Sequence, residues 1–107
     1  MRLDPLYFEE IRSGRKRIEI RLNDFKRQKI RIGDKIKFLD RSNEKNSLNV
    51  EVVGKNIFPD LISLFDFYAL GEFGNVWNCS EEAVNAVTYY SKSDIEKYGL
   101  LALEVHL

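Results

Sequence analysis

The sequence contains a single cysteine, Cys79, and a single histidine, His106, among its 107 residues. One cysteine excludes a disulfide within the chain, and this pair falls short of the ligand set of a structural zinc site. No apolar run approaches the roughly 18 residues that a membrane-spanning helix needs. The first residues are not followed by the apolar stretch that a secretory signal peptide has. We therefore expect a cytoplasmic protein with no membrane association, no metal site and no cofactor.

An excess of charge of either sign is also missing, since 17 basic residues balance 17 acidic residues. A basic field of the whole protein therefore cannot attract nucleic acid, and any such binding needs a local patch. The charges are unevenly distributed, however, because basic side chains far outnumber acidic ones between residues 11 and 37. This asymmetry indicates contact with a polyanion, although a solvated, charge-rich surface also explains it.

The spacing of apolar residues predicts the elements of one domain spanning residues 1–107. Alternation predicts strands at 15–22, 35–39, 48–57 and 101–107. Helix signals are an N-cap and proline at Asp4-Pro5 with a stop at Gly14, further N-caps at Asp60 and Ser80, and a last helix from Ser91 to Tyr98. We expect a polar loop at 40–47 and an ordered loop at 69–78. Because helices do not alternate with strands, the pattern favours a small curved sheet or barrel, an α+β fold dominated by β structure.

The segment Gly14-Arg15-Lys16-Arg17-Ile18-Glu19-Ile20-Arg21 has the pattern Gly-x-Lys-x-x-Glu-x-Arg. This pattern resembles the signature of the ASCH family (activating-signal-cointegrator homology domains), which is related to the PUA group of RNA-binding barrels. The segment from Ile30 to Phe38 is also similar to the family, and the tail from Tyr89 to Gly99 resembles a bacterial subgroup of it. The resemblance implies a small PUA-like barrel of about five to six mostly antiparallel strands with short flanking helices. It also implies a cleft where Lys16, Glu19 and Arg21 converge, and RNA or a nucleotide as partner.

The residue types in this segment suit a phosphate-containing ligand. Lys16 offers a mobile point charge, and Arg21 offers a planar fork that grips phosphate or a base edge. Glu19 can accept a hydrogen bond from an exocyclic amine or pair with an arginine. Strict alternation places Lys16 on the opposite face of the strand from Glu19, so convergence needs a twist or bulge near Arg17. The predicted ligand-binding residues are Gly14, Arg15, Lys16, Arg17, Glu19, Arg21, Trp77 and Tyr90.

The aromatic residues near the 69–78 loop have two interpretations. A base can stack on Trp77, Phe73 or Tyr68, and Tyr89 and Tyr90 can line the same cleft. In a small domain, side chains of this size also commonly form the core.

Two other functions compete with binding alone. Some bacterial relatives resemble amidohydrolases that deacetylate acetylcytidine, and others have been linked to RNA cleavage. Catalysis of this kind implies Lys16, Glu19 and Glu72, with Glu72 as the nearest counterpart of the third acid and Glu81 and Glu82 as the other candidates. The hydrolases carry threonine, the expected nucleophile, where this sequence has Glu19, so Lys16 and Glu72 would instead activate a water. A protein-interaction module, in which the motif is structural, is the third alternative.

Overall fold

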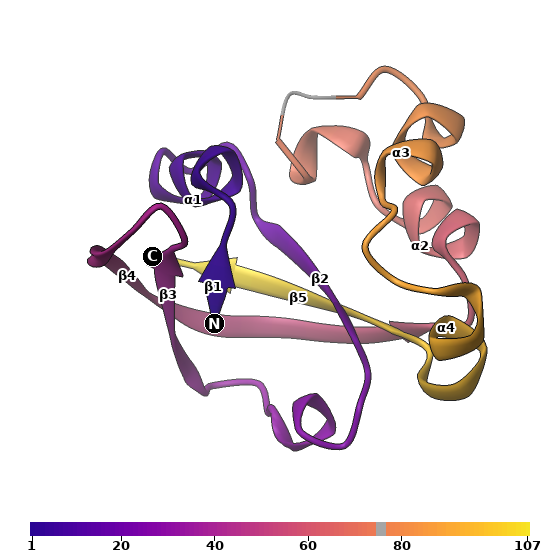
Figure 1. The fold of residues 1–107 in the computed structure, drawn as a ribbon, viewed down its shortest axis with the longest axis horizontal. Coiled ribbons are helices and arrows are strands. Elements are labelled where there is room, and N and C mark those ends of the chain that lie inside the picture. The colour runs from indigo at the N-terminus through magenta and orange to yellow at the C-terminus, as the bar shows by residue number, and fades with distance from the viewer. Residues whose placement is uncertain (75–76) are drawn as a thin grey trace.

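The computed structural model describes residues 1–74 and 77–107. Its strands form one curled sheet with the order β1-β3-β4-β5-β2, in which β1 runs parallel to β3 and the other neighbours are antiparallel. Short helices flank this half-barrel (Figure 1). The elements are β1 (Arg2–Leu3), α1 (Pro5–Arg12), β2 (Ile18–Leu22), η1 (Arg27–Lys29), β3 (Lys35–Asp40), β4 (Asn43–Phe58), α2 (Leu61–Phe67), η2 (Leu70–Glu72), α3 (Ser80–Ala86), α4 (Lys92–Tyr98) and β5 (Leu100–His106). The expected α+β class dominated by β structure is confirmed.

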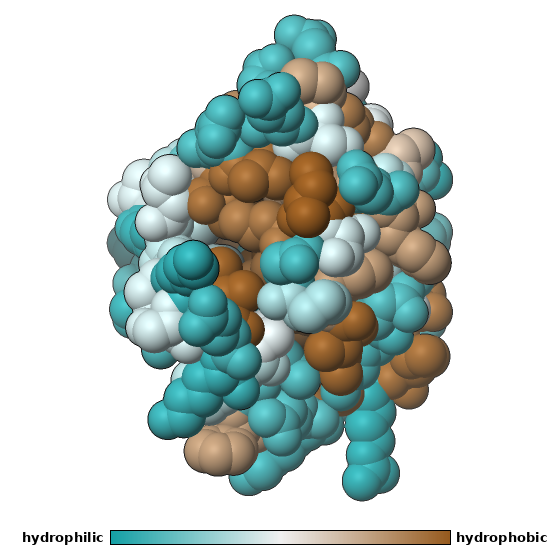
Figure 2. Space-filling model, turned by 90° about the vertical axis from the view of Figure 1, so that its right-hand side faces the viewer, coloured by the Kyte–Doolittle hydropathy of each residue, from teal (hydrophilic) through white to brown (hydrophobic). Residues whose placement is uncertain are grey.

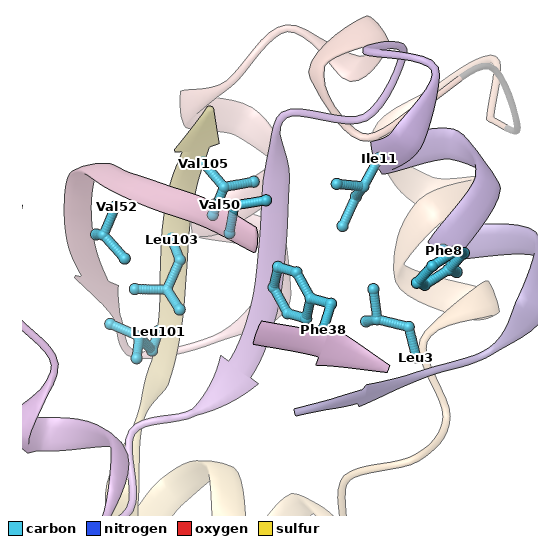
Figure 3. Packing of buried hydrophobic residues seen from close by; sticks show 9 residues of the cluster. All are labelled: Leu3, Phe8, Ile11, Phe38, Val50, Val52, Leu101, Leu103 and Val105. Carbon is cyan, nitrogen blue, oxygen red and sulfur yellow. The ribbon is translucent and has the colours of Figure 1, made fainter. Parts of the chain in front are cut away.

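Two apolar clusters pack against the two faces of the sheet. The first lies inside the curl, where Phe8 and Ile11 of α1 meet Phe38 of β3 and apolar side chains of β4 and β5 (Figure 3). The second joins Ile18 and Ala102 to α2 and α3, and includes Leu64, Phe65 and Phe73. Because β5 lies between these clusters, Leu100, Leu101, Ala102 and Leu103 are all fully buried. The alternation expected for the last strand therefore does not separate a solvent-exposed face from a buried one.

The helix signals in the sequence hold with small shifts. Asp4 caps α1 through a hydrogen bond from the Leu6 N–H, and Asp60 and Ser91 cap α2 and α4 in the same way. The helix α3 is capped at Cys79 and not at Ser80, which is its first helical residue. Among the described residues, no helix is long and apolar enough to cross a membrane.

The expected loop at 40–47 is wrong. The strand β4 begins at Asn43, so only Arg41 and Ser42 form the turn, which Asp40 stabilises by accepting hydrogen bonds from the Ser42 N–H and hydroxyl. This end of the hairpin is exposed. Backbone pairing and polar side-chain contacts maintain it there, and these leave no apolar alternation in the sequence. The pairing of β4 with β5 has a register shift between Val52 and Gly54.

Apolar side chains also remain on the surface at the end of the molecule that carries α2, α3 and α4. Figure 2 shows this side, where apolar surface is broken up by polar side chains. The exposed apolar residues of α2 and the end of β4 are Ile57, Ile62 and Phe67.

The Gly99→Ala substitution is expected to lower the free energy of unfolding by about 1–3 kcal/mol. Gly99 links α4 to β5 with φ 76° and ψ 178°, a conformation that side chains disfavour. An added Cβ would also lie 3.2 Å from the Phe58 carbonyl oxygen. Urea unfolding followed by circular dichroism measures the effect. The control is Gly71→Ala, whose Cβ would meet no atom within 4 Å; equal losses in the two variants would contradict the prediction.

Candidate functional site

A half-open cavity of about 510 Å³ lies where the two outer strands of the sheet, β1 and β2, approach each other. The start of α1 and the segment from α3 to Tyr90 complete its walls. Its lining contains four cations, two carboxylates, four aromatic rings and five smaller apolar residues. These are Arg2, Lys16, Arg21 and Arg41; Asp4 and Glu19; Tyr7, Trp77, Tyr89 and Tyr90; and Leu3, Leu6, Ile20, Ala86 and Val87.

Lys16 reaches the cavity because the chain is not yet a regular strand at that point. Gly14 turns the chain with φ +82°, and the Lys16 N–H donates to the Glu10 carbonyl at 2.9 Å. The regular strand begins only at Ile18, and Lys16 forms an isolated bridge with Phe73. The alternation that would separate Lys16 from Glu19 therefore does not apply. Lys16 Nζ donates to the Ile18 carbonyl at 2.6 Å and lies 3.7 Å from Glu19 Oε1.

Glu19 is a buried carboxylate between two cations. Only 6% of its surface is exposed, and Arg21 donates to Oε2 from Nε at 3.0 Å and from Nη2 at 2.8 Å. The same Nη2 donates to the Arg2 carbonyl at 2.8 Å. This hydrogen bond connects β2 to β1 across the gap between the two outer strands (the seam). A buried carboxylate is stable only when paired and hydrogen-bonded, and Lys16 and Arg21 meet both requirements.

The electrostatics of the cavity differ from those of the exposed surface. Lys16 is 4% exposed, and burial lowers the pKa of its ammonium, while the neighbouring Glu19 carboxylate partly offsets this shift. The ring of Tyr7 faces the ammonium, with its centroid 5.3 Å from Nζ, and adds a cation–π contact. A lowered pKa makes the neutral amine of lysine more accessible, and this neutral amine can act as a base or nucleophile.

The tyrosines on the opposite wall are hydrogen-bond donors at neutral pH. Burial raises the pKa of Tyr90, whose hydroxyl donates to the Ile20 carbonyl at 3.2 Å. Burial likewise raises the pKa of Tyr89, whose hydroxyl lies 2.9 Å from that of Tyr7. This contact connects α1 to the segment before α4.

The structure brings together five of the residues expected to bind ligand: Lys16, Glu19, Arg21, Trp77 and Tyr90 all line the cavity. Gly14, Arg15 and Arg17 are not among the described residues of its lining. Gly14 turns the backbone, and Arg15 pairs with Glu10 at 2.9 Å. Arg17 pairs with Glu72 at 3.4 Å, and ligand contacts of Gly14, Arg15 and Arg17 stay a prediction.

Glu72, expected as the third catalytic acid, also lies outside the described lining of the cavity. Its carboxylate is 3.4 Å from Arg17 Nε, and its backbone carbonyl accepts a hydrogen bond from the Arg17 N–H at 2.7 Å. The bridge between Lys16 and Phe73 sets this arrangement, because adjacent residues in an extended chain point in opposite directions. Of the aromatics considered for stacking, Phe73 is fully buried in the core. Tyr68 accepts a hydrogen bond from Asn56 at 2.7 Å.

Three residues of the lining were not predicted from the sequence: Arg2, Tyr7 and Arg41. Arg2 lies on a two-residue strand that is too short for any periodic signal, and its parallel pairing with β3 also places Arg41 nearby. The only hint in the sequence was the basic character of Arg2 and Arg41. Among the described residues, no group of three His, Cys, Asp or Glu side chains that could hold a metal ion exists.

The Lys16→Met substitution is expected to change how stability depends on pH. Because the pKa of Lys16 is lowered in the folded protein, the unfolded chain binds more protons between that value and the ordinary lysine pKa of about 10.4. Wild-type stability should therefore rise with pH across this window relative to that of the variant. Urea unfolding between about pH 7 and about pH 10 measures both curves. The exposed Lys37→Met variant should follow the wild type, and parallel curves for Lys16→Met would refute the prediction.

Comparison with known proteins agrees with this architecture. The chain is similar to the crystal structure of hypothetical protein PH0355, with 28% identity, a TM-score of 0.84, and coverage of 99% of this chain and 94% of that one. The solution structure of protein PF0455 from Pyrococcus furiosus shares the fold, with 23% identity, a TM-score of 0.71, and coverage of 99% and 96%. No curated protein matches significantly. The profile of the ASCH domain matches residues 1–106, and the chain therefore belongs to the ASCH domain family.

Proposed function

We propose that the cavity at the seam between β1 and β2 binds a nucleotide, either free or as part of a single-stranded RNA. The observation that carries this proposal is the composition of the lining, in which four cations and four aromatic rings surround a space of about 510 Å³. Binding pockets for small molecules commonly have volumes of about 300–1,000 Å³. The family to which the chain belongs has a PUA-type fold and is generally linked to RNA, which agrees with this ligand class.

The charges of the lining favour an anion. Glu19 is already paired with Lys16 and Arg21, and the Asp4 side chain accepts from the Leu6 N–H at the start of α1. Four cations against two carboxylates leave a positive balance in the cavity of a protein whose net charge is zero. A phosphate near Arg2, Arg21 and Arg41 is the ligand group that this balance suits, because guanidinium groups bind phosphate in a bidentate manner.

The aromatic side of the cavity suits a base. Trp77, Tyr89 and Tyr90 come from the chain between η2 and α4, which forms one wall of the cavity, and Tyr89 is 61% exposed. Stacking of a base on an aromatic side chain contributes about 1–3 kcal/mol in single-stranded nucleic-acid complexes. A nucleotide, with its base on this wall and its phosphate at the arginines, matches both halves of the cavity.

The Arg41→Ala substitution is expected to weaken binding of a single-stranded RNA hexamer about three- to tenfold, the loss of roughly one hydrogen bond. It should also lower the salt dependence of binding, because one fewer phosphate is neutralised. Quenching of Trp77, the only tryptophan of the chain, reports binding. The matched control is Arg31→Ala, an equally exposed arginine outside the described lining of the cavity. Equal affinities for both variants and the wild type would rule out the proposed site.

A second candidate is hydrolysis of an N-acylated nucleoside, and the buried Lys16–Glu19 pair favours it. In its deprotonated form, Lys16 would take a proton from water as that water attacks the amide carbonyl. The C–N bond would then break, the proton would pass to the leaving amine, and a carboxylic acid and the nucleoside would be released. Neither the threonine of the related hydrolases nor the carboxylate of Glu72 takes part in this route.

Release of cytidine from N4-acetylcytidine tests the hydrolase candidate. Wild-type protein at a concentration near that of the substrate should release cytidine, and Lys16→Met should abolish the release, because methionine cannot accept a proton. Chromatography of the nucleosides measures both rates. No release by the wild type, or equal release by Lys16→Met, removes this candidate and leaves the binding proposal intact.

A further inference from the structure

The two outer strands of the half-barrel present unpaired backbone groups to the cavity. In the pairing of β2 with β5, the Val105 N–H donates to the Arg17 carbonyl at 2.8 Å, and the Asn23 N–H donates to the Gly99 carbonyl at 3.0 Å. The register is regular from Ile18 to Leu22, so successive residues alternate in direction. The N–H and C=O of Ile20 therefore point away from β5, toward the seam.

The opposite edge follows the same rule. The Leu39 N–H donates to the Met1 carbonyl and the Arg41 N–H donates to the Leu3 carbonyl, both at 2.8 Å, so β3 pairs with the residues on either side of Arg2. The backbone of Arg2 consequently points toward β2, where its carbonyl accepts from Arg21. Both Arg2 and Ile20 line the cavity.

The carbonyls along this seam already have partners. The Lys16 side chain donates to the Ile18 carbonyl, and the Tyr90 hydroxyl donates to the Ile20 carbonyl. The Arg21 side chain donates to the Arg2 carbonyl. In the described part of the chain, the register turns the N–H groups of Ile20 and Arg2 away from their paired strands, and outside these strand pairs they donate to no other residue. The seam is therefore rich in donors, and its complement is a ligand that carries acceptors. An added peptide strand would need free donors and acceptors in alternation, which argues against such an occupant.

The positions of the two donors differ in their surroundings. Ile20 packs in the cluster that also contains Trp77 and Tyr90. Arg2 lies on the cationic side, linked to Arg21. We infer that the main-chain N–H of Ile20 binds an acceptor on the base of the nucleotide, a ring nitrogen or a carbonyl oxygen, while the phosphate lies at the arginines. This inference rests on the proposed function and adds to it the group that recognises the base.

Amide NMR of the wild-type protein tests the inference directly. In the free protein, the Ile20 amide should exchange with solvent faster than the amides of Glu19 and Arg21, which face β5. Titration with cytidine 5′-monophosphate should shift the Ile20 amide and slow its exchange. Ribose 5-phosphate, which lacks the base, should instead shift resonances of the arginine side chains and leave the Ile20 amide unchanged.

The outcomes separate this inference from the proposal beneath it. Nucleotide binding reported by Trp77 without a change at the Ile20 amide would overturn the inference and retain the nucleotide site. An equal change with ribose 5-phosphate would assign this N–H to phosphate and would also overturn it. An Ile20 amide that is protected in the free protein would show that the edge is not open. No binding of either probe would overturn the proposed function and this inference together.

A proline substitution provides an independent measurement. Ile20→Pro removes the N–H without breaking a bond of the β2–β5 ladder, and proline is tolerated on an outer strand at such positions. Affinity for cytidine 5′-monophosphate should fall about three- to tenfold, the effect of one hydrogen bond. Leu22→Pro removes an N–H that faces the same way but outside the described lining of the cavity, and it should bind as the wild type does. Equal affinities for the two variants would count against the inference.

Discussion

The burial of the Glu19 carboxylate constrains everything around the seam. A charge in this position must be compensated, and the compensation comes from two cations that are two and three residues away in the sequence: Arg21 and Lys16. Lys16 reaches it only because the chain turns at Gly14 and enters β2 late. Arg21 in turn contacts the Arg2 carbonyl and connects the outer strands. The motif therefore connects the two outer strands and also supplies charged groups to the cavity.

The contact between Arg21 and the Arg2 carbonyl also explains why a cavity exists at all. If β1 and β2 paired through their backbones, the sheet would close and its edges would vanish. A guanidinium group spans the gap instead, and α1 and the segment before α4 form walls on either side. The space between them is lined with both cations and aromatic rings. A single arrangement thus resolves the problem of an open sheet and creates a site for a ligand.

Much of the fold was predictable because its signals are local. The caps at Asp4, Asp60 and Ser91 and the strand β3 follow from side chains that act within a few residues of themselves. The strand β1 and the first part of β4 were not predictable, because they are stabilised by backbone pairing with distant partners and carry no apolar period. The strand β5 was recognised from its sequence, but its burial on both faces was not, because this burial depends on the neighbouring strands and on both apolar clusters.

The sequence by itself determined the family and the central group of the site, because Lys16, Glu19 and Arg21 lie within one short motif. It also determined the alternation that forms β2. Only the tertiary structure decided which other residues join them: it brings in Arg2, Tyr7 and Arg41 and sends Arg17 and Glu72 to a separate ion pair. Contacts of this kind depend on which strand edges meet. That meeting is governed by the packing of two cores around a curled sheet, and no local pattern of residues records it.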